Sequence, residues 1–383
     1  MAAYDVAILG AGPAGSVTAL VLARAGVKTV LIDGSSEDAP RRGETLAALA
    51  APVLARLWLT DAVARLKLPH VVGFVSSWGS RCAVARSSLL VPEANTFVVD
   101  RHRFDRTLRD EATGAGATLL CRRIRSAERD GKRWRIHALP GGEAATEEFF
   151  AHVLVDASGR GARFAQRCSA RLLAIDKLVA VTAVLEATPA DADRSVRIES
   201  VPDGWLFATL DASGNRVVSF FTDGDLCSDA ASADAKQRLD QALARSETMA
   251  YQSMARQAHG CAHAPIRYWS ATTATLNCAV GPGLIAVGDA AQSHDPLSSQ
   301  GITRAMEDAE SAALALIAAF DGDPRGLDRH EQLRRRTFVY YLQKRHRYYA
   351  VEQRWADQTF WRRRHDVGAL STLATLWRES QTV

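Results

Sequence analysis

Three glycines near the start of the chain constrain its fold more than any other feature. They are Gly10, Gly12 and Gly15, in the pattern G-x-G-x-x-G. The apolar residues 6–9 before them are typical of a buried parallel strand, and residues 14–25, rich in Ala, Leu and Val, predict a helix. In such a turn the first glycine makes the bend, the second lets a pyrophosphate reach the backbone, and the third lets helix and strand pack closely. The sequence therefore predicts a phosphate-binding βα turn at a helix N-terminus.

An acid at the end of the next strand completes this fingerprint. Residues 28–32 read as a second strand, followed by Asp33, the eighteenth residue after Gly15. A carboxylate at that point can accept hydrogen bonds from a ribose. The segment is predicted to bind a dinucleotide, and FAD and NAD(P) both fit these residues.

A later segment, "GLIAVGDAAQSHDPLSSQG" from residue 283, bears on which dinucleotide is bound. It reads as a strand over 284–287, a turn at Gly288 and Asp289, a loop with Pro296, and a helix from about Gly301. Asp289 can hold a ribityl hydroxyl. Backbone N–H groups around Pro296 and Gly301 can face a flavin pyrimidine ring, where negative charge accumulates on reduction. A third stretch, "VLVDASGRG" over 153–161, reads as a strand that runs into Asp156, Gly159 and Gly161.

Composition is that of an ordinary soluble globular protein. The chain has 383 residues, enough for two or three domains, with 47% hydrophobic and 23% charged residues. No run approaches the roughly 20 apolar residues of a membrane span. No export signal is visible, so a cytoplasmic location is expected. Six scattered cysteines without a C-x-x-C pattern indicate neither a disulfide framework nor a metal site.

The charge is unevenly distributed. Residues 329–364 hold eleven Lys or Arg against three acids, with aromatics interleaved at near-helical spacing. We expect amphipathic helices that pack aromatics inward and show charge outward, with the basic face docking an acidic partner. Under this hypothesis, reversing the charge of Arg334, Arg335 and Arg336 would slow docking. Binding to nucleic acid or to a membrane is not expected.

The order of elements predicts an α/β fold with a discontinuous organisation. A Rossmann-type (GR2-like) dinucleotide-binding domain is expected over residues 1–68, 98–175 and 272–325. An inserted antiparallel-sheet substrate domain is expected over 69–97 and 176–271, because strand patterns dominate 177–224. A helical C-terminal region is expected over 326–383.

The motifs together resemble the FAD-dependent monooxygenase superfamily, which also includes flavin-dependent halogenases and geranylgeranyl reductases. The resemblance covers most of the chain through "GAGPAG", "RRGET", "VVDRHRFDRTL", "DASGRG" and "GDAAQSHDPLSSQG". It implies that FAD is the cofactor and that Arg42 and Arg101 contact it. The full set of residues expected to bind the cofactor is Gly10, Gly12, Pro13, Ala14, Gly15, Asp33, Arg42, Gly43, Glu44, Arg101, Asp156, Gly159, Gly288, Asp289, Pro296, Gly301 and Ile302.

Within that superfamily, "VSSWGS", "HDPLSSQG" and "YYAVEQRWADQTFWRRRH" resemble the flavoproteins that mature tryptophylquinone cofactors, the LodB-like, GoxB-like and QhpG-like proteins. This implies hydroxylation of a tryptophan in the precursor of a partner amine oxidase or dehydrogenase. Oxygen would be transferred from a flavin C4a-hydroperoxide formed with O₂. The reductant would be NAD(P)H, visiting transiently or acting through a separate reductase, since no second G-x-G-x-x-G with a flanking strand and helix is present.

The candidates for proton transfer are His70 and His294, with Asp295 as a partner, and Trp78, Trp205 and Phe207 are candidate pocket residues. Core packing is the alternative role for the two tryptophans. Two other functions remain open. The first is a flavin halogenase or a small-molecule aromatic hydroxylase, although the halogenase G-W-x-W-x-I-P pattern is incomplete at 204–208 and Lys67 is out of register with the halogenase lysine. The second is a non-catalytic FAD-binding escort protein.

Overall fold

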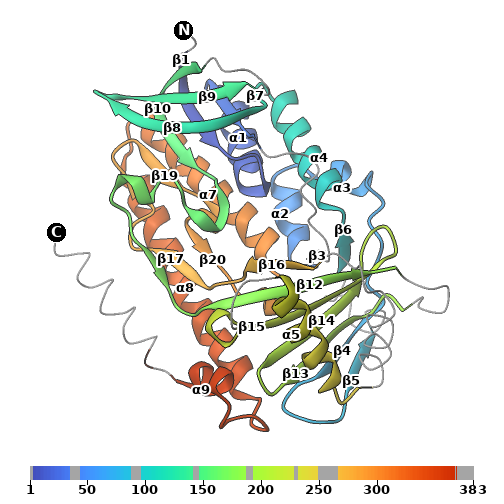
Figure 1. Cartoon of the computed structure of the whole chain (residues 1–383). Coiled ribbons are helices and arrows are strands. Elements are labelled where there is room, and N and C mark those ends of the chain that lie inside the picture. The colour runs from blue at the N-terminus through green and yellow to red at the C-terminus, as the bar shows by residue number, and fades with distance from the viewer. Residues whose placement is uncertain are drawn as a thin grey trace.

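The computed structural model describes residues 3–34, 44–87, 96–140, 146–186, 193–227, 232–248, 266–366 and 368. Two large sheets lie in different parts of the molecule, and helices from the end of the chain lie beside both (Figure 1). The expected α/β class, with a Rossmann-type sheet, a second inserted sheet and a helical C-terminal region, is confirmed.

The first sheet has eight strands and carries the predicted dinucleotide-binding motifs. Its order is β18-β19-β10-β1-β2-β7, and β9 and β8 extend it beside β10. The pairs β1–β10, β1–β2, β2–β7 and β10–β19 are parallel. The strands are β1 (Ala3–Leu9), β2 (Thr29–Ile32), β7 (Thr118–Leu120), β8 (Arg122–Asp130), β9 (Arg133–Pro140), β10 (Glu147–Asp156), β18 (Val280–Gly281) and β19 (Leu284–Ala286).

Both faces of the sheet are buried at its parallel strands β1, β2 and β19, which explains the continuous apolar runs of these strands. Val6 and Ile8 face a core formed with α1 (Pro13–Arg24), α4 (Arg101–Gly114) and α7 (Gly301–Phe320). Ala7 and Leu9 face a second core that contains Trp134. The expected first helix and second strand are confirmed to within one residue at each end.

The second sheet has seven strands in the order β16-β12-β15-β14-β13-β4-β5. All of its pairs are antiparallel except β13–β4, which is parallel, so the expectation of a purely antiparallel sheet needs this one correction. Helix α5 (Ser232–Ala244) packs Leu239 and Leu243 against it. The strands are β4 (Gly73–Ser77), β5 (Val84–Ser87), β12 (Leu178–Leu185), β13 (Val196–Val201), β14 (Gly204–Leu210), β15 (Arg216–Asp223) and β16 (Arg267–Ser270).

The remaining elements connect the two sheets. The small sheets are β11-β17-β20 and β3-β6. Their strands are β3 (Glu44–Leu46), β6 (Phe97–Val99), β11 (Leu172–Ala174), β17 (Ala274–Leu276) and β20 (Gln292–Ser293). The short helices are α2 (Ala50–Arg56), α3 (Thr60–Ala64), η2 (Gly159–Gly161), η3 (Gln166–Cys168), η4 (Gly224–Leu226), η5 (Gly288–Ala290) and η6 (Pro296–Ser298).

Two C-terminal helices complete the described chain. The long helix α8 (Arg325–Ala350) packs on α7, and α9 (Thr359–His365) packs on α8. Figure 1 shows α8 and α9 in orange and red at the lower left, beside the seven-stranded sheet. In the part of the chain that the structure describes, no helix combines the length and apolar character needed to cross a bilayer.

Candidate functional site

The predicted motifs meet at the carboxyl ends of the parallel strands. Leu9 at the end of β1 lies opposite Ile32 of β2 and Asp156 of β10, and Asp156 lies opposite Ala286 of β19. The chain segments that follow these four residues therefore leave the sheet at one edge. In open parallel sheets this edge is where ligands bind. We call it the carboxyl edge.

The three glycines of the first turn have different surroundings. A Cβ on Gly10, which has a φ of +113°, would lie 2.4 Å from the Ala157 carbonyl oxygen. A Cβ on Gly15 would lie 1.9 Å from the Gly10 carbonyl oxygen. A Cβ on Gly12 would meet no atom of the described residues within 4 Å. Gly10 and Gly15 are thus required by packing, whereas Gly12 borders open space, as expected for the glycine that a pyrophosphate approaches.

Two helix N-termini face the same region. Helix α1 begins at Pro13, after the N-cap Gly12, and helix α7 begins at Gly301, after the N-cap Gln300. Neither N-cap residue makes a side-chain capping hydrogen bond. A Cβ on Gly288 would lie 2.6 Å from the Ala14 Cβ and 3.5 Å from the Ala305 Cβ, so Gly288 lies between the first turn of α1 and the second turn of α7. Both ends are therefore available to stabilise negative charge on a ligand.

Asp289 follows Gly288 and pairs with an arginine that the sequence analysis did not single out. Its Oδ2 atom lies 3.3 Å from the Arg160 Nε, and 35% of its side chain stays exposed. Desolvation raises the pKa of Asp289, and the Arg160 guanidinium opposes this shift. Arg160 also donates to the carbonyl oxygens of Thr272 and His294, both at 2.8 Å. The sequence signal that could have identified Arg160 is its position within the motif "DASGRG".

Asp156 shapes the loop after β10. Its carboxylate is fully buried and accepts three backbone N–H groups, from Ser158 at 3.0 Å, Phe164 at 2.9 Å and Ala165 at 2.8 Å. These bonds fold residues 157–165 around the end of the strand. Gly159 in this loop has a φ of +75°, and a Cβ there would meet open space. A direct contact of either residue with FAD stays a prediction.

Arg101 lies at the start of α4 in a cluster of acids. Its Nε and Nη2 atoms each donate to Asp105, both at 3.0 Å, and its Nη1 atom donates to Glu44 on β3. Burial lowers the pKa of Arg101, but the two carboxylates outweigh this effect, so its pKa lies above the ordinary value. The other residues expected here, Arg42 and Gly43, lie outside the described residues.

The segment after Gly288 leaves polar groups available to a ligand. Within residues 292–304, five buried polar atoms make no hydrogen bond to the rest of the described chain. They are Gln292 Oε1, His294 Nε2, Ser298 Oγ, Thr303 Oγ1 and Arg304 Nε. Buried polar atoms normally make hydrogen bonds. Five buried atoms without one in a single short segment therefore indicate a bound molecule or ordered water. The donor and acceptor atoms here, with the open space at Gly12 and Gly301, fit a dinucleotide with a polar ring system.

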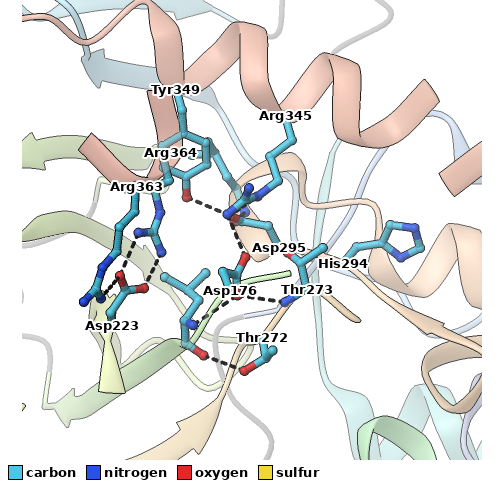
Figure 2. A network of polar contacts seen from close by, with 12 residues as sticks. Asp176, Asp223, Thr272, Thr273, His294, Asp295, Arg345, Tyr349, Arg363 and Arg364 are labelled. Atoms are coloured by element: carbon cyan, nitrogen blue, oxygen red, sulfur yellow. Dashed lines mark hydrogen bonds and ion pairs between the residues drawn. The ribbon is translucent and has the colours of Figure 1, made fainter. Parts of the chain in front are cut away.

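Asp295 ties this segment to the C-terminal helices (Figure 2). Its Oδ1 atom accepts the Leu297 N–H at 2.9 Å and so caps η6. Its Oδ2 atom accepts the Tyr349 hydroxyl at 2.7 Å and the Arg345 Nε at 3.2 Å. Arg345 also donates to Asp176 at 2.7 Å. We call Asp176, Asp295, Arg345 and Tyr349 the latch.

The candidate bases occupy different environments. His294 is buried, and its ring packs against Tyr341 and Phe338 with centroid distances of 4.5 and 5.9 Å. Burial, with nearby Arg304 and Arg160, lowers the pKa of His294 well below its usual value, so its imidazole is neutral at pH 7. Figure 2 shows this ring apart from the latch. His70 is exposed and packs on Phe97 with a centroid distance of 4.4 Å.

The candidate pocket residues differ in exposure. Trp205 is fully buried, stacks on Phe221 at 3.9 Å and donates to the Tyr349 hydroxyl at 3.1 Å. Trp78 is partly exposed, lies edge-on to Trp205, and donates to the Tyr348 carbonyl oxygen at 2.8 Å. Phe207 is partly buried beside the same cluster. Trp78 therefore offers more surface to a substrate than Trp205 does.

The expectation that the C-terminal segment shows its charge outward is wrong in part. Arg334, Arg345 and Arg364 point inward and pair with carboxylates. Arg334 is 2% exposed and donates to Glu331 at 2.6 Å and to Thr275 at 2.7 Å. Reversal of its charge would bury two like charges and disrupt the fold, so it cannot report on docking. Arg345 and Arg364 were missed because their carboxylate partners are distant in sequence, whereas Arg334 pairs with Glu331 of the same helix.

Comparisons with known proteins agree with this geometry. A family model described as "FAD binding domain" matches residues 3–343. LodB of Marinomonas mediterranea, named as an FAD-dependent oxidoreductase, is 29% identical over 97% of this chain and 99% of its own length. The solved structure of QhpG, a peptidyl tryptophan dihydroxylase essential for tryptophylquinone cofactor biogenesis, covers 96% of this chain and 79% of its own, with 25% identity and a TM-score of 0.78. The halogenase CndH from a myxobacterium covers 100% and 90%, with 21% identity and a TM-score of 0.82.

Proposed function

Because the chain belongs to the FAD-binding domain family and is an FAD-dependent oxidoreductase, we propose that it is a monooxygenase that hydroxylates an aromatic ring. We further propose that this ring is a tryptophan side chain in the precursor of an amine oxidase or dehydrogenase, modified during tryptophylquinone biogenesis. O₂ and NAD(P)H, used directly or through a reductase, are the co-substrates. We also propose a location in the cytoplasm.

The observation that carries the proposal is the carboxyl edge with the five buried polar atoms of residues 292–304 that make no hydrogen bond within the described chain. LodB supports it through a match over nearly the whole of both chains. QhpG adds support through its fold and its described action on a peptidyl tryptophan. A small-molecule halogenase is the competing function, because CndH shares the fold. Lys67, the lysine nearest the position expected for the halogenase lysine, is exposed on the loop after α3.

The chain's own residues would hold the cofactor in a defined orientation. Gly12 and the N-terminus of α1 would bind the pyrophosphate, Asp33 a ribose, and Asp289 a ribityl hydroxyl. The first turn of α7, after Gly301, would direct its N–H groups at the pyrimidine ring and stabilise charge there. FAD, when bound, supplies the redox chemistry that activates O₂.

The ring proton lost from the substrate needs an acceptor. His294 is neutral at pH 7, and its Nε2 atom makes no hydrogen bond within the part of the chain that the structure describes, so this atom can accept a proton. It is therefore the preferred candidate over the exposed His70. Trp78 would contact the substrate ring by edge-to-face packing.

The test is a reaction under oxygen-18 gas with NAD(P)H, or with a flavin reductase. The substrates are the purified unmodified precursor of a tryptophylquinone enzyme and, separately, free tryptophan, each with bromide present. We expect the precursor to gain 16 mass units with oxygen-16 gas and 18 with oxygen-18 gas. A brominated product would establish the halogenase. Turnover of free tryptophan with no change in the precursor would remove the protein substrate, and FAD that is never reduced would favour an escort protein.

A further inference from the structure

The outward face of α8 carries large apolar side chains. Leu333, Tyr340, Tyr348 and the C-cap residue Val351 are 51–61% exposed. They recur at intervals that keep them on one side of a helix. At 1.5 Å per residue, the eighteen steps from the first to the last span about 27 Å. Buried residues of the same helix, such as Phe338 and Leu342, face the opposite way.

The charged residues on this face are basic. Arg336, Lys344 and Arg347 are exposed between the apolar side chains. The Lys344 Nζ lies 4.6 Å from the centre of the Tyr340 ring. The two glutamates of this stretch, Glu331 and Glu352, are buried and neutralise inward arginines. We call Leu333, Arg336, Tyr340, Lys344, Arg347, Tyr348 and Val351 the outer stripe.

One end of the outer stripe reaches the candidate pocket. The Tyr348 carbonyl oxygen accepts the Trp78 Nε1–H at 2.8 Å. Glu352, the residue after the stripe, accepts the Gly79 N–H at 2.8 Å. A polypeptide that lies along the stripe would thus end at the turn that carries Trp78.

The residue types of the outer stripe indicate which kind of molecule binds there. Exposed tyrosine and arginine at regular spacing are typical of protein interfaces rather than of solvated helix faces. A second copy of the chain would bring like charges together, which is unfavourable. The chain's own residues 369–383 hold one acid and one base, so they offer no net negative charge.

We propose that the outer stripe is the docking surface for the partner polypeptide and that it receives a helical segment with apolar side chains flanked by acidic ones. This inference rests on the proposed function for the existence of a protein partner. It keeps Arg336 in the docking group and replaces Arg334 and Arg335 by Lys344 and Arg347, which face solvent.

The test compares two variants with the same change in charge. The first is Arg336→Glu, Lys344→Glu and Arg347→Glu in the stripe. The control is Arg125→Glu, Lys132→Glu and Arg133→Glu, all exposed on the hairpin of β8 and β9. Binding of the FAD-loaded proteins to the purified precursor is followed by biolayer interferometry from 50 to 500 mM NaCl. FAD content and NAD(P)H oxidation without precursor verify that each variant is folded.

We expect the stripe variant to associate at least tenfold more slowly than wild type at 50 mM salt. The difference should shrink as salt rises, because the attraction is screened. Tyr340→Ser with Tyr348→Ser should speed dissociation at every salt concentration. The hairpin control should match wild type.

The outcomes separate this proposal from the proposed function. A precursor that is hydroxylated and bound equally by wild type and stripe variant overturns the docking surface and leaves the function standing. A precursor that binds through the stripe but gains no oxygen overturns the proposed function and leaves the docking surface standing. Wild-type protein that sediments as a dimer, and becomes monomeric on stripe reversal, would assign the stripe to a second copy and overturn the proposal.

Discussion

The carboxyl edge and the C-terminal helices hold their functional groups by opposite means. At the edge, three glycines leave room for a ligand, and a Cβ on Gly12 would meet nothing within 4 Å among the residues that the structure describes. In the C-terminal segment, large charged side chains fill the interior, and Arg345 reaches Asp176 across 169 residues of sequence. The comparison shows that the ligand site depends on the absence of side chains at its glycines. The latch depends instead on buried side chains of opposite charge that pair with one another.

The largest effects are expected from substitutions of Gly12 and Gly15 at the carboxyl edge, and the two substitutions should have different consequences. Gly15→Val should prevent folding, because a Cβ there would lie 1.9 Å from the Gly10 carbonyl oxygen. Gly12→Val should leave the apoprotein folded but abolish FAD binding, because its side chain fills the space that the pyrophosphate needs. Far-ultraviolet circular dichroism and the flavin absorbance of purified protein measure both. A Gly12→Val protein with a full complement of FAD would contradict the assignment.

The next effect concerns the latch. Arg345→Met should lower the free energy of unfolding by about 3–5 kcal/mol, because it leaves the buried carboxylates of Asp176 and Asp295 without their cation. Arg362→Met, at an exposed position on α9, should change it by less than about 0.5 kcal/mol. Urea denaturation measures both variants. Equal effects would show that the latch does not stabilise the fold.

A smaller effect is expected from Asp289. Asp289→Ala should weaken FAD binding about ten- to a hundredfold, as expected for the loss of one charged hydrogen bond of about 1.5–3 kcal/mol. Asp110→Ala, on the exposed side of α4, should leave the affinity unchanged. Fluorescence titration of apoprotein with FAD gives both dissociation constants. An unchanged constant for Asp289→Ala would remove this residue from the site.

The smallest effect is a pH dependence that comes from His294. Its pKa is lowered in the folded protein, so below about pH 6.5 the unfolded chain takes up a proton that the folded chain does not. Stability should therefore fall as pH drops from 7 to 5.5, by at most about 1.4 kcal/mol per pH unit for this residue. His294→Gln should flatten the slope, and exposed His102→Gln should not. Unchanged slopes for both variants would contradict a buried neutral His294.

The edge could be predicted from the sequence because its signals are local. The turn spans Gly10–Gly15, and the second strand ends at Asp33, so spacing alone predicts both elements. The latch could not be predicted in this way. Asp295 and Tyr349 are 54 residues apart, and no periodicity indicates that they bond. Amphipathic reasoning also placed all charge of α8 outward, whereas Arg334 and Arg345 are satisfied inside by acids from other elements and from α8 itself.

A crystal structure of the FAD-bound protein tests the central claim most directly. This claim is that the carboxyl edge is the cofactor site and that the latch holds the segment around Asp295 in place. We expect the pyrophosphate against Gly12 and the first turn of α1, with Asp289 near the ribityl chain. The pyrimidine edge of the flavin should face the segment from Pro296 to Gly301, with Asp295 still bonded to Arg345 and Tyr349. Flavin bound at another edge, or an Asp295 that leaves the latch to bond the flavin, would contradict the account.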